Sequence, residues 1–223
     1  MTERAHPLHD QSVGEIAARL AGASNVFRRF GIDFCCQGHV SLKDAANHRS
    51  SDLDELETAL DALDPSAPQP VPQETGALIE HIKTCYHDVH RQQIPELIAL
   101  SRKVEAVHVN HPNVPAGLAE TLQHVWGELE VHMKKEELMV FPAMLRQRAG
   151  SLAEPIREMR HDHNDHAAFL DQIGRLTDDY TPPQDACRSW RTLYDGVAQF
   201  RADLMEHVHL ENNVLFPRFE TAA

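Results

Sequence analysis

A short motif occurs twice in the second half of the chain and restricts the folds that this chain can adopt. In each copy a glutamate lies four residues after a histidine, and Phe-Pro begins five residues after the glutamate. The two copies are His132, Glu136, Phe141 and Pro142, and His207, Glu211, Phe216 and Pro217. Identical spacing in two stretches of helical pattern predicts a helical bundle with internal pseudo-twofold symmetry, in which both copies lie at comparable depths.

Both copies fall on apolar stripes with helical periodicity. The first stripe is Leu118, Leu122, Val125, Leu129, His132, Glu136 and Met139, and the second is Leu193, Val197, Phe200, Leu204, His207, Glu211 and Val214. Alternating steps of three and four residues are typical of a buried helix face. Imidazoles and carboxylates are normally buried only when they are paired or bind a metal, so the stripes predict that these groups have such partners.

The rest of the chain predicts an all-α protein with two parts. Residues 1–64 contain short helical patterns without strand-like alternation, which predict a small helical N-terminal domain. Residues 65–73 contain Pro65, Pro68, Pro70 and Pro72 and predict an extended linker. Residues 74–223 contain four long helical patterns with short breaks, which predict an up-down-up-down four-helix bundle. These patterns cover residues 75–109, 115–148, 152–177 and 184–219.

The other two long helices offer further histidines. His163 and His166 share the apolar face of the third helix, whereas His161 lies off that face, so His163 is the better ligand candidate of the pair His161 and His163. The stripe of the first helix passes between His87 and His90 and selects neither. One histidine from each helix and two bridging glutamates make six ligands, which suit a pair of metal ions rather than one tetrahedral zinc. We interpret His90, His166 and His209 as neighbours of the site or as surface groups.

Composition excludes several classes of function. The formal net charge is −13, with 21 Lys and Arg against 34 Asp and Glu, so nucleic acid is not an expected partner. No stretch approaches the roughly 18 to 20 apolar residues that a membrane-spanning helix needs. The N-terminal sequence lacks the pattern of a signal or transit peptide, which favours a cytoplasmic location. The 4 cysteines are too few for a disulfide scaffold and are expected to be reduced.

Several segments together resemble the repair-of-iron-centres family of di-iron proteins. The segments HMKKEELMVFP, DHNDHAAFLDQI and DLMEHVHLENNVLFPR are similar to its hemerythrin-like domain, and GIDFCCQGHVSL is similar to the small ScdA-type domain that precedes it. The resemblance implies a hemerythrin-like bundle holding two non-haem iron ions with an oxo or hydroxo bridge. It assigns the terminal ligands to His87, His132, His163 and His207, and the bridging carboxylates to Glu136 and Glu211.

The resemblance also implies roles for residues outside the ligand set. Glu128 and Asp162 fall where the family carries acidic residues near the site, which suggests an entry or proton path. Cys35 and Cys36 correspond to the family's vicinal pair and imply thiol redox chemistry or iron delivery, from a turn expected to be exposed. Gln37 replaces the glycine that usually follows that pair. Cys85 and Cys187 are interpreted as packing residues in the bundle.

The family implies repair of iron-sulfur clusters damaged by nitrosative or oxidative stress. Iron donation, binding and removal of nitric oxide, or both would serve this function, with damaged iron-sulfur proteins as clients. One alternative is a protein that sequesters or senses nitric oxide or dioxygen without a client. Another is an enzyme that reduces nitric oxide. The apolar residues Phe27, Phe30 and Phe34 exceed what a small domain is expected to bury, which suggests a homodimer.

Overall fold

A computed structural model describes residues 7–67, 71–146 and 152–220. Within these ranges the regular structure is helical apart from one isolated β-bridge, between Ser12 and Ser41, so the all-α class is confirmed. Pro68 and Pro70 of the predicted linker, and the predicted end of a helix at residue 148, lie outside the described residues. None of the helices in the described ranges combines the length and apolar character needed to cross a membrane.

The N-terminal part contains short helices, and three of those described begin at a side-chain cap. The short elements are the 3₁₀ turn η1 (Leu8–Asp10) and helices α1 (Val13–Arg19), α2 (Ala23–Arg29), α3 (Leu42–Arg49) and α4 (Leu53–Asp61). Ser12 and Glu15 form a capping box at α1, and Ser41 and Asp52 accept backbone N–H bonds at α3 and α4. Polar caps thus mark the starts of α1, α3 and α4, whereas α2 begins after Gly22, which has a positive φ and provides no side-chain cap.

Two aromatic residues that suggested a dimer are buried within the N-terminal part. Phe27 and Phe34 are fully buried and contact each other, with ring centroids 5.8 Å apart. Phe30 is half-buried, with the guanidinium of Arg29 over its ring. The expected apolar excess is therefore wrong for Phe27 and Phe34, and the dimer itself stays a prediction.

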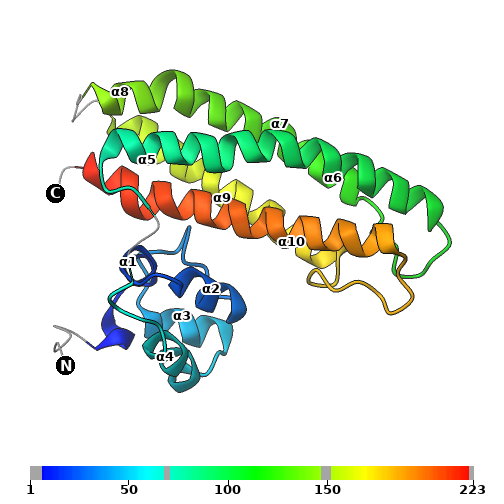
Figure 1. Cartoon of the computed structure of the whole chain (residues 1–223), viewed down its shortest axis with the longest axis horizontal. Helices are drawn as coiled ribbons and strands as arrows, with labels where there is room; N and C mark the ends of the chain where they lie inside the picture. Colours follow the sequence, from blue (N-terminus) through cyan, green and yellow to red (C-terminus); the bar gives the residue numbers. More distant parts are fainter. Residues whose placement is uncertain (1–6, 68–70, 147–151, 221–223) are drawn as a thin grey trace. The chain divides into compact units, whose positions relative to one another are not determined.

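The remaining helices form the four long arms of the bundle (Figure 1). The first arm is α5 (Thr75–Ile82), η2 (Lys83–His87) and α6 (Asp88–Val107); the second is α7 (Leu118–Lys135), η3 (Glu136–Val140) and α8 (Phe141–Leu145). The third is α9 (Ala153–Leu176), and the fourth is α10 (Arg188–His209), η4 (Leu210–Leu215) and η5 (Phe216–Arg218). Each arm matches its predicted range to within a few residues.

Contacts between residues divide the chain into two compact units. One is Met1–Leu78 with Met205–Ala223, and the other is Ile79–Leu204.

Three arms contain a π-helical segment, and these segments move the buried face by one residue. The π segments are η2, η3 and η4, in which hydrogen bonds span five residues instead of four. Met139, predicted to be buried, is 61% exposed, whereas Val140 is 3% exposed. Likewise Val214 is only half-buried and Leu215 is fully buried. The predicted stripes are confirmed up to the π segments and wrong after them, because each segment adds one residue to its turn.

The cysteines also differ from expectation. Cys35 is buried and Cys36 is half-buried, so the expected exposed turn is wrong for Cys35. Cys85 and Cys187 are both exposed, so the interpretation of these two as packing residues is wrong. Cys85 lies on the outer side of η2, and Cys187 precedes α10, with its Sγ 3.3 Å from Nε2 of His108.

The end of α10 is packed against the N-terminal helices within one unit. His209 is buried, with its ring 5.3 Å from that of Phe34 and its Nδ1 3.0 Å from the amide nitrogen of Asn213. Burial lowers the pKa of His209 from 6.5 to about 4, although a hydrogen bond with the backbone of Phe34 opposes this change. His209 is therefore neutral in the folded protein at neutral pH.

This burial predicts a pH-dependent stability. Because the unfolded chain binds a proton near pH 6.5 and the folded chain only near pH 4, the contribution of His209 to stability is lost as the pH falls between these values. For one proton the slope is at most about 1.4 kcal/mol per pH unit. His209→Asn keeps a hydrogen-bonding side chain but cannot titrate, so urea denaturation of metal-free protein should show a shallower decline. Equal slopes for His209→Asn and the parent would contradict the assignment.

Candidate metal centre

Four of the six predicted ligands lie in the unit Ile79–Leu204, and all four are buried. His87 ends η2, His132 lies on α7, Glu136 begins η3, and His163 lies on α9. Oε2 of Glu136 is 3.4 Å from Nε2 of His87, and Oε1 is 3.4 Å from Nε2 of His132. Nε2 of His163 is 3.0 Å from Nε2 of His132. One carboxylate thus faces imidazoles from two different arms, which is the placement that a bridging ligand requires.

The remaining two ligands are four residues apart on the continuous helix formed by α10 and η4. Nε2 of His207 lies 3.1 Å from Oε1 of Glu211, and both side chains are buried. Glu211 is the second residue of η4, as Glu136 is the first of η3, so both carboxylates belong to π segments. Such segments are rare and occur frequently at functional sites.

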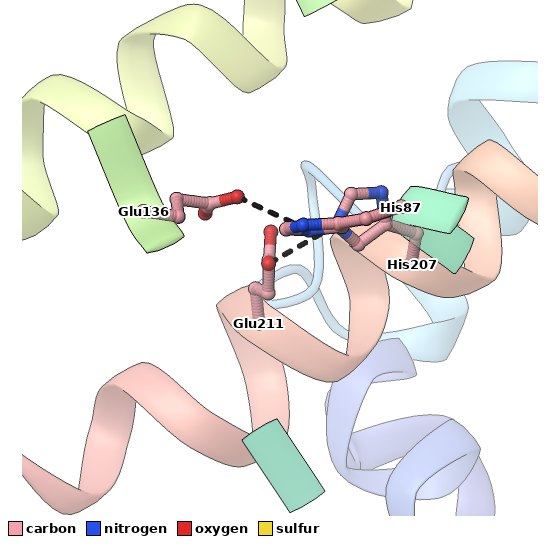
Figure 2. Close-up of side chains that lie close together, drawn as sticks. All are labelled: His87, Glu136, His207 and Glu211. Carbon is pink, nitrogen blue, oxygen red and sulfur yellow. Dashed lines mark hydrogen bonds and ion pairs between the residues drawn. The ribbon is translucent and has the colours of Figure 1, made fainter. Parts of the chain in front are cut away.

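The six side chains form two overlapping groups of metal-ligand atoms. One group contains His87, Glu136, His207 and Glu211, drawn in Figure 2, and the other contains His132, Glu136, His163 and Glu211. In each group the ligand atoms lie within 4.8 Å of one another, and both glutamates occur in both groups. Nitrogen and carboxylate donors suit iron, manganese or zinc. The donor set therefore fits a pair of metal ions that share two carboxylates, as in a non-haem di-iron site.

Glu137, a carboxylate outside the predicted ligand set, binds the ring nitrogen of His87 that faces away from the other ligands. Nδ1 of His87 lies 2.8 Å from Oε1 of Glu137, so this nitrogen donates and Nε2 is the atom left for a metal. Arg91 binds both oxygens of Glu137, at 2.9 and 3.1 Å, and its Nε donates to Glu130 at 3.0 Å. The bond from His87, opposed by burial and helped by Arg91, lowers the pKa of Glu137 to about 2. Glu137 is thus a fixed negative charge that sets the orientation of His87.

A second carboxylate holds His132 in the same way. Nδ1 of His132 lies 3.1 Å from Oδ2 of Asp162, and Lys135 donates to the same oxygen at 2.9 Å. The bond from His132 holds the pKa of Asp162 well below its usual range, with burial opposing and Lys135 assisting. Asp162 was singled out in the sequence as a residue near the site, and the structure puts it in contact with a predicted ligand.

The other residues that the sequence suggested as neighbours of the site differ in where they lie. Glu128 lies on the exposed face of α7 and is not in either ligand group. His166 is buried beside His132, with ring centroids 4.9 Å apart, and His90 is buried against Phe200 at 5.6 Å. Both fit the interpretation of neighbours to the site. Sequence reasoning missed Glu137 and Arg91, although Glu137 directly follows a predicted ligand and could have been tested as a partner of the facing helix.

A separate group of ligand-type residues comprises Asp33, Cys35 and Cys36, which follow α2. The hydrogen bond that the Cys35 thiol donates to Cys36, together with burial, raises the pKa of the Cys35 thiol well above its ordinary value. Without a bound cation Cys35 is therefore a neutral thiol at neutral pH.

Two family models match the chain. Residues 77–219 match the hemerythrin HHE cation binding domain, and residues 9–64 match a domain of unknown function, DUF542.

Curated relatives cover nearly the whole chain. An iron-sulfur cluster repair protein YtfE of Dickeya chrysanthemi is 45% identical over 212 residues, which is 94% of this chain and 96% of the relative. Proteins of the same name from Cronobacter sakazakii and Pectobacterium atrosepticum are 44% and 42% identical over 215 residues, with the same coverage of both chains.

The shared carboxylates predict loss of both metal ions together. The double substitution Glu136→Leu and Glu211→Leu exchanges buried charges for apolar groups of similar size, so the helices should stay folded while the site can no longer hold metal. Elemental analysis and circular dichroism of the purified variant should show helical protein with almost no iron. The matched control exchanges two exposed glutamates, Glu120→Leu with Glu154→Leu, and should keep the iron of the parent. A Glu136 and Glu211 variant that still holds two ions would show that the bridging groups lie elsewhere.

The contact between Glu137 and His87 predicts a graded effect. Glu137→Gln removes the fixed charge but keeps a hydrogen-bonding side chain, so iron should remain bound but with about ten- to a hundredfold weaker affinity. Competition with a chelator measures this change directly. Glu154→Gln, on an exposed part of α9, should behave like the parent, and unchanged affinity in Glu137→Gln would rule out the positioning role.

Proposed function

The chain belongs to the hemerythrin-like family of iron-sulfur cluster repair proteins, and from this premise we propose that it repairs iron-sulfur clusters damaged by nitrosative or oxidative stress. The metal is two non-haem iron ions with an oxo or hydroxo bridge, held by the six histidine and glutamate ligands. The clients are damaged iron-sulfur proteins. The proposal keeps the cytoplasmic location expected from the sequence.

One observation carries the proposal: two groups of four ligand atoms share both glutamates. A structural zinc site closes all four positions of one ion, whereas six protein ligands for two ions leave positions for small molecules. Iron bound there would supply reversible binding of nitric oxide or dioxygen and one-electron chemistry. A centre of this kind suits both removal of nitric oxide and release of iron.

The surrounding residues hold the ligands and limit the access of water. Glu137 and Asp162 fix the ring orientation of His87 and His132, and Arg91 and Lys135 hold these carboxylates in turn. The six ligands are buried, which keeps bulk water away from them. The iron is therefore held by preorganised side chains on rigid helices and not by mobile loops. The thiols of Cys35 and Cys36 belong to the proposal as participants in redox chemistry or iron delivery.

The repair function predicts recovery of a damaged client. Iron-loaded protein, added under anaerobic conditions to a purified hydratase whose cluster nitric oxide has destroyed, should restore hydratase activity with a reductant and a sulfide source. Free ferrous iron at the same concentration, held by a weak chelator, should restore less. The iron-free variant Glu136→Leu with Glu211→Leu should restore no more than the buffer.

A nitric oxide titration in the same assay separates the other functions. Stoichiometric uptake without any restored hydratase activity would favour a protein that sequesters or senses the gas. Many turnovers to nitrous oxide without restored activity would favour a reductase. Either result would replace the repair function.

A further inference from the structure

The loop after α2 brings together three side chains that metals bind, apart from the histidine and glutamate centre. Asp33, Cys35 and Cys36 each offer a ligand atom, and these atoms lie within 4.8 Å of one another. Cys35 is 5% exposed and Cys36 is half-buried, so the group lies at the edge of the N-terminal core and not on an open surface. The packing of the core does not require two sulfurs and a carboxylate to converge, and the function proposed above uses the two thiols without assigning them a metal site of their own.

The distances match those of a tetrahedral metal site. The two Sγ atoms are 3.8 Å apart, and Sγ of Cys35 is 3.3 Å from Oδ1 of Asp33. With metal–sulfur bonds of about 2.3 Å and tetrahedral angles, two thiolates lie about 3.8 Å apart, and a carboxylate oxygen lies about 3.5 Å from each sulfur. The sulfurs are much farther apart than the roughly 2 Å of a disulfide. The three atoms already stand close to the positions that one ion requires.

The loop is held in this conformation from two sides. The backbone N–H of Cys36 donates to Oδ1 of Asp33 at 2.9 Å, which fixes the carboxylate beside the sulfurs. The amide of Asn212 donates to the carbonyl of Cys35 at 3.0 Å, and the amide of Asn213 donates to the carbonyl of Phe34 at 3.0 Å. Both asparagines belong to η4 and to the same compact unit as the loop.

The close approach of Asn213 depends on glycine at position 38. A Cβ on Gly38 would lie 2.1 Å from Oδ1 of Asn213 and could not be accommodated without movement of the loop or of the asparagine. The ligand atoms are thus brought together before any ion arrives, which lowers the entropic cost of binding.

We propose that Asp33, Cys35 and Cys36 form a mononuclear site for a thiophilic divalent transition-metal ion such as Zn²⁺ or Fe²⁺. Two sulfurs select such ions over Mg²⁺ and Ca²⁺, and three protein ligands leave the fourth position for an exogenous ligand. The site is separate from the paired ions of the bundle and holds a third metal ion per chain. It goes beyond the repair function, and its test does not use repair activity.

Zinc binding to the iron-loaded, reduced full-length protein tests the site. After incubation with Zn²⁺ and removal of the excess with a weak chelator, elemental analysis should find one zinc per chain and unchanged iron. X-ray absorption at the zinc edge, which iron does not obscure, should show two sulfur neighbours at about 2.3 Å. Cys35→Ser with Cys36→Ser should lose the zinc and keep the iron, which also reports that the fold is intact. The matched control, Cys85→Ser with Cys187→Ser, should keep both metals.

Two further variants keep the test decisive if the double serine variant fails to fold. Cys36→Ser changes only the half-buried thiol, and Asp33→Asn keeps an oxygen that can accept the N–H bond of Cys36; both should weaken zinc binding at least tenfold. Zinc retained by these variants, zinc without sulfur neighbours, zinc that displaces the two iron ions of the bundle, or reduced parent protein that binds no zinc would each overturn the proposal.

Discussion

Four imidazoles and two carboxylates lie at the centre of an apolar helical bundle, and the rest of the structure accommodates them. Unpaired groups of this kind would strongly destabilise the core, so each must meet a partner or an ion. Glu136 lies between histidines from two arms, Glu211 contacts His207 on its own helix, and the outward nitrogens of His87 and His132 bind Glu137 and Asp162. Those carboxylates are paired with Arg91 and Lys135 at the surface. From the buried ligands outwards, each ligand histidine of this pair thus contacts a carboxylate, and each of those carboxylates is paired with a basic side chain.

Most of the fold could be predicted from the sequence, and the six residues predicted as ligands lie close together in two overlapping groups. Capped apolar turns and long stripes define the helices, and two matched His and Glu pairs on those stripes indicate a dinuclear site. The register after each pair could not be predicted, because a stripe of α-helical period does not contain the extra residue of a π segment. The choice between His87 and His90 stayed open for the same reason. Segment η2 moves the buried position from Tyr86 to His87.

The partners of the ligands were harder to predict than the ligands. Asp162 was identified through the family resemblance, whereas Glu137 and Arg91 were missed because polar residues on the outer half of a helix look like ordinary solvated groups. Cys35 was misjudged because its loop has the composition of an exposed turn. The backbone of this loop accepts hydrogen bonds from Asn212 and Asn213, which lie far along the chain, and no local sequence pattern contains that contact.

The three π segments also restrict which deletions this chain can accept during evolution. Deleting one residue from η3 would return that arm to regular α-helical hydrogen bonding, and the helix alone would gain regularity. The same deletion would turn every later residue of the arm by about 100° around the helix axis and separate Glu136 from the residues packed beyond it. The deletion would also move Val140 and Phe141, which are buried, out of their places in the core. The π segments thus give up helix regularity but keep the ligands and the buried residues after them in register.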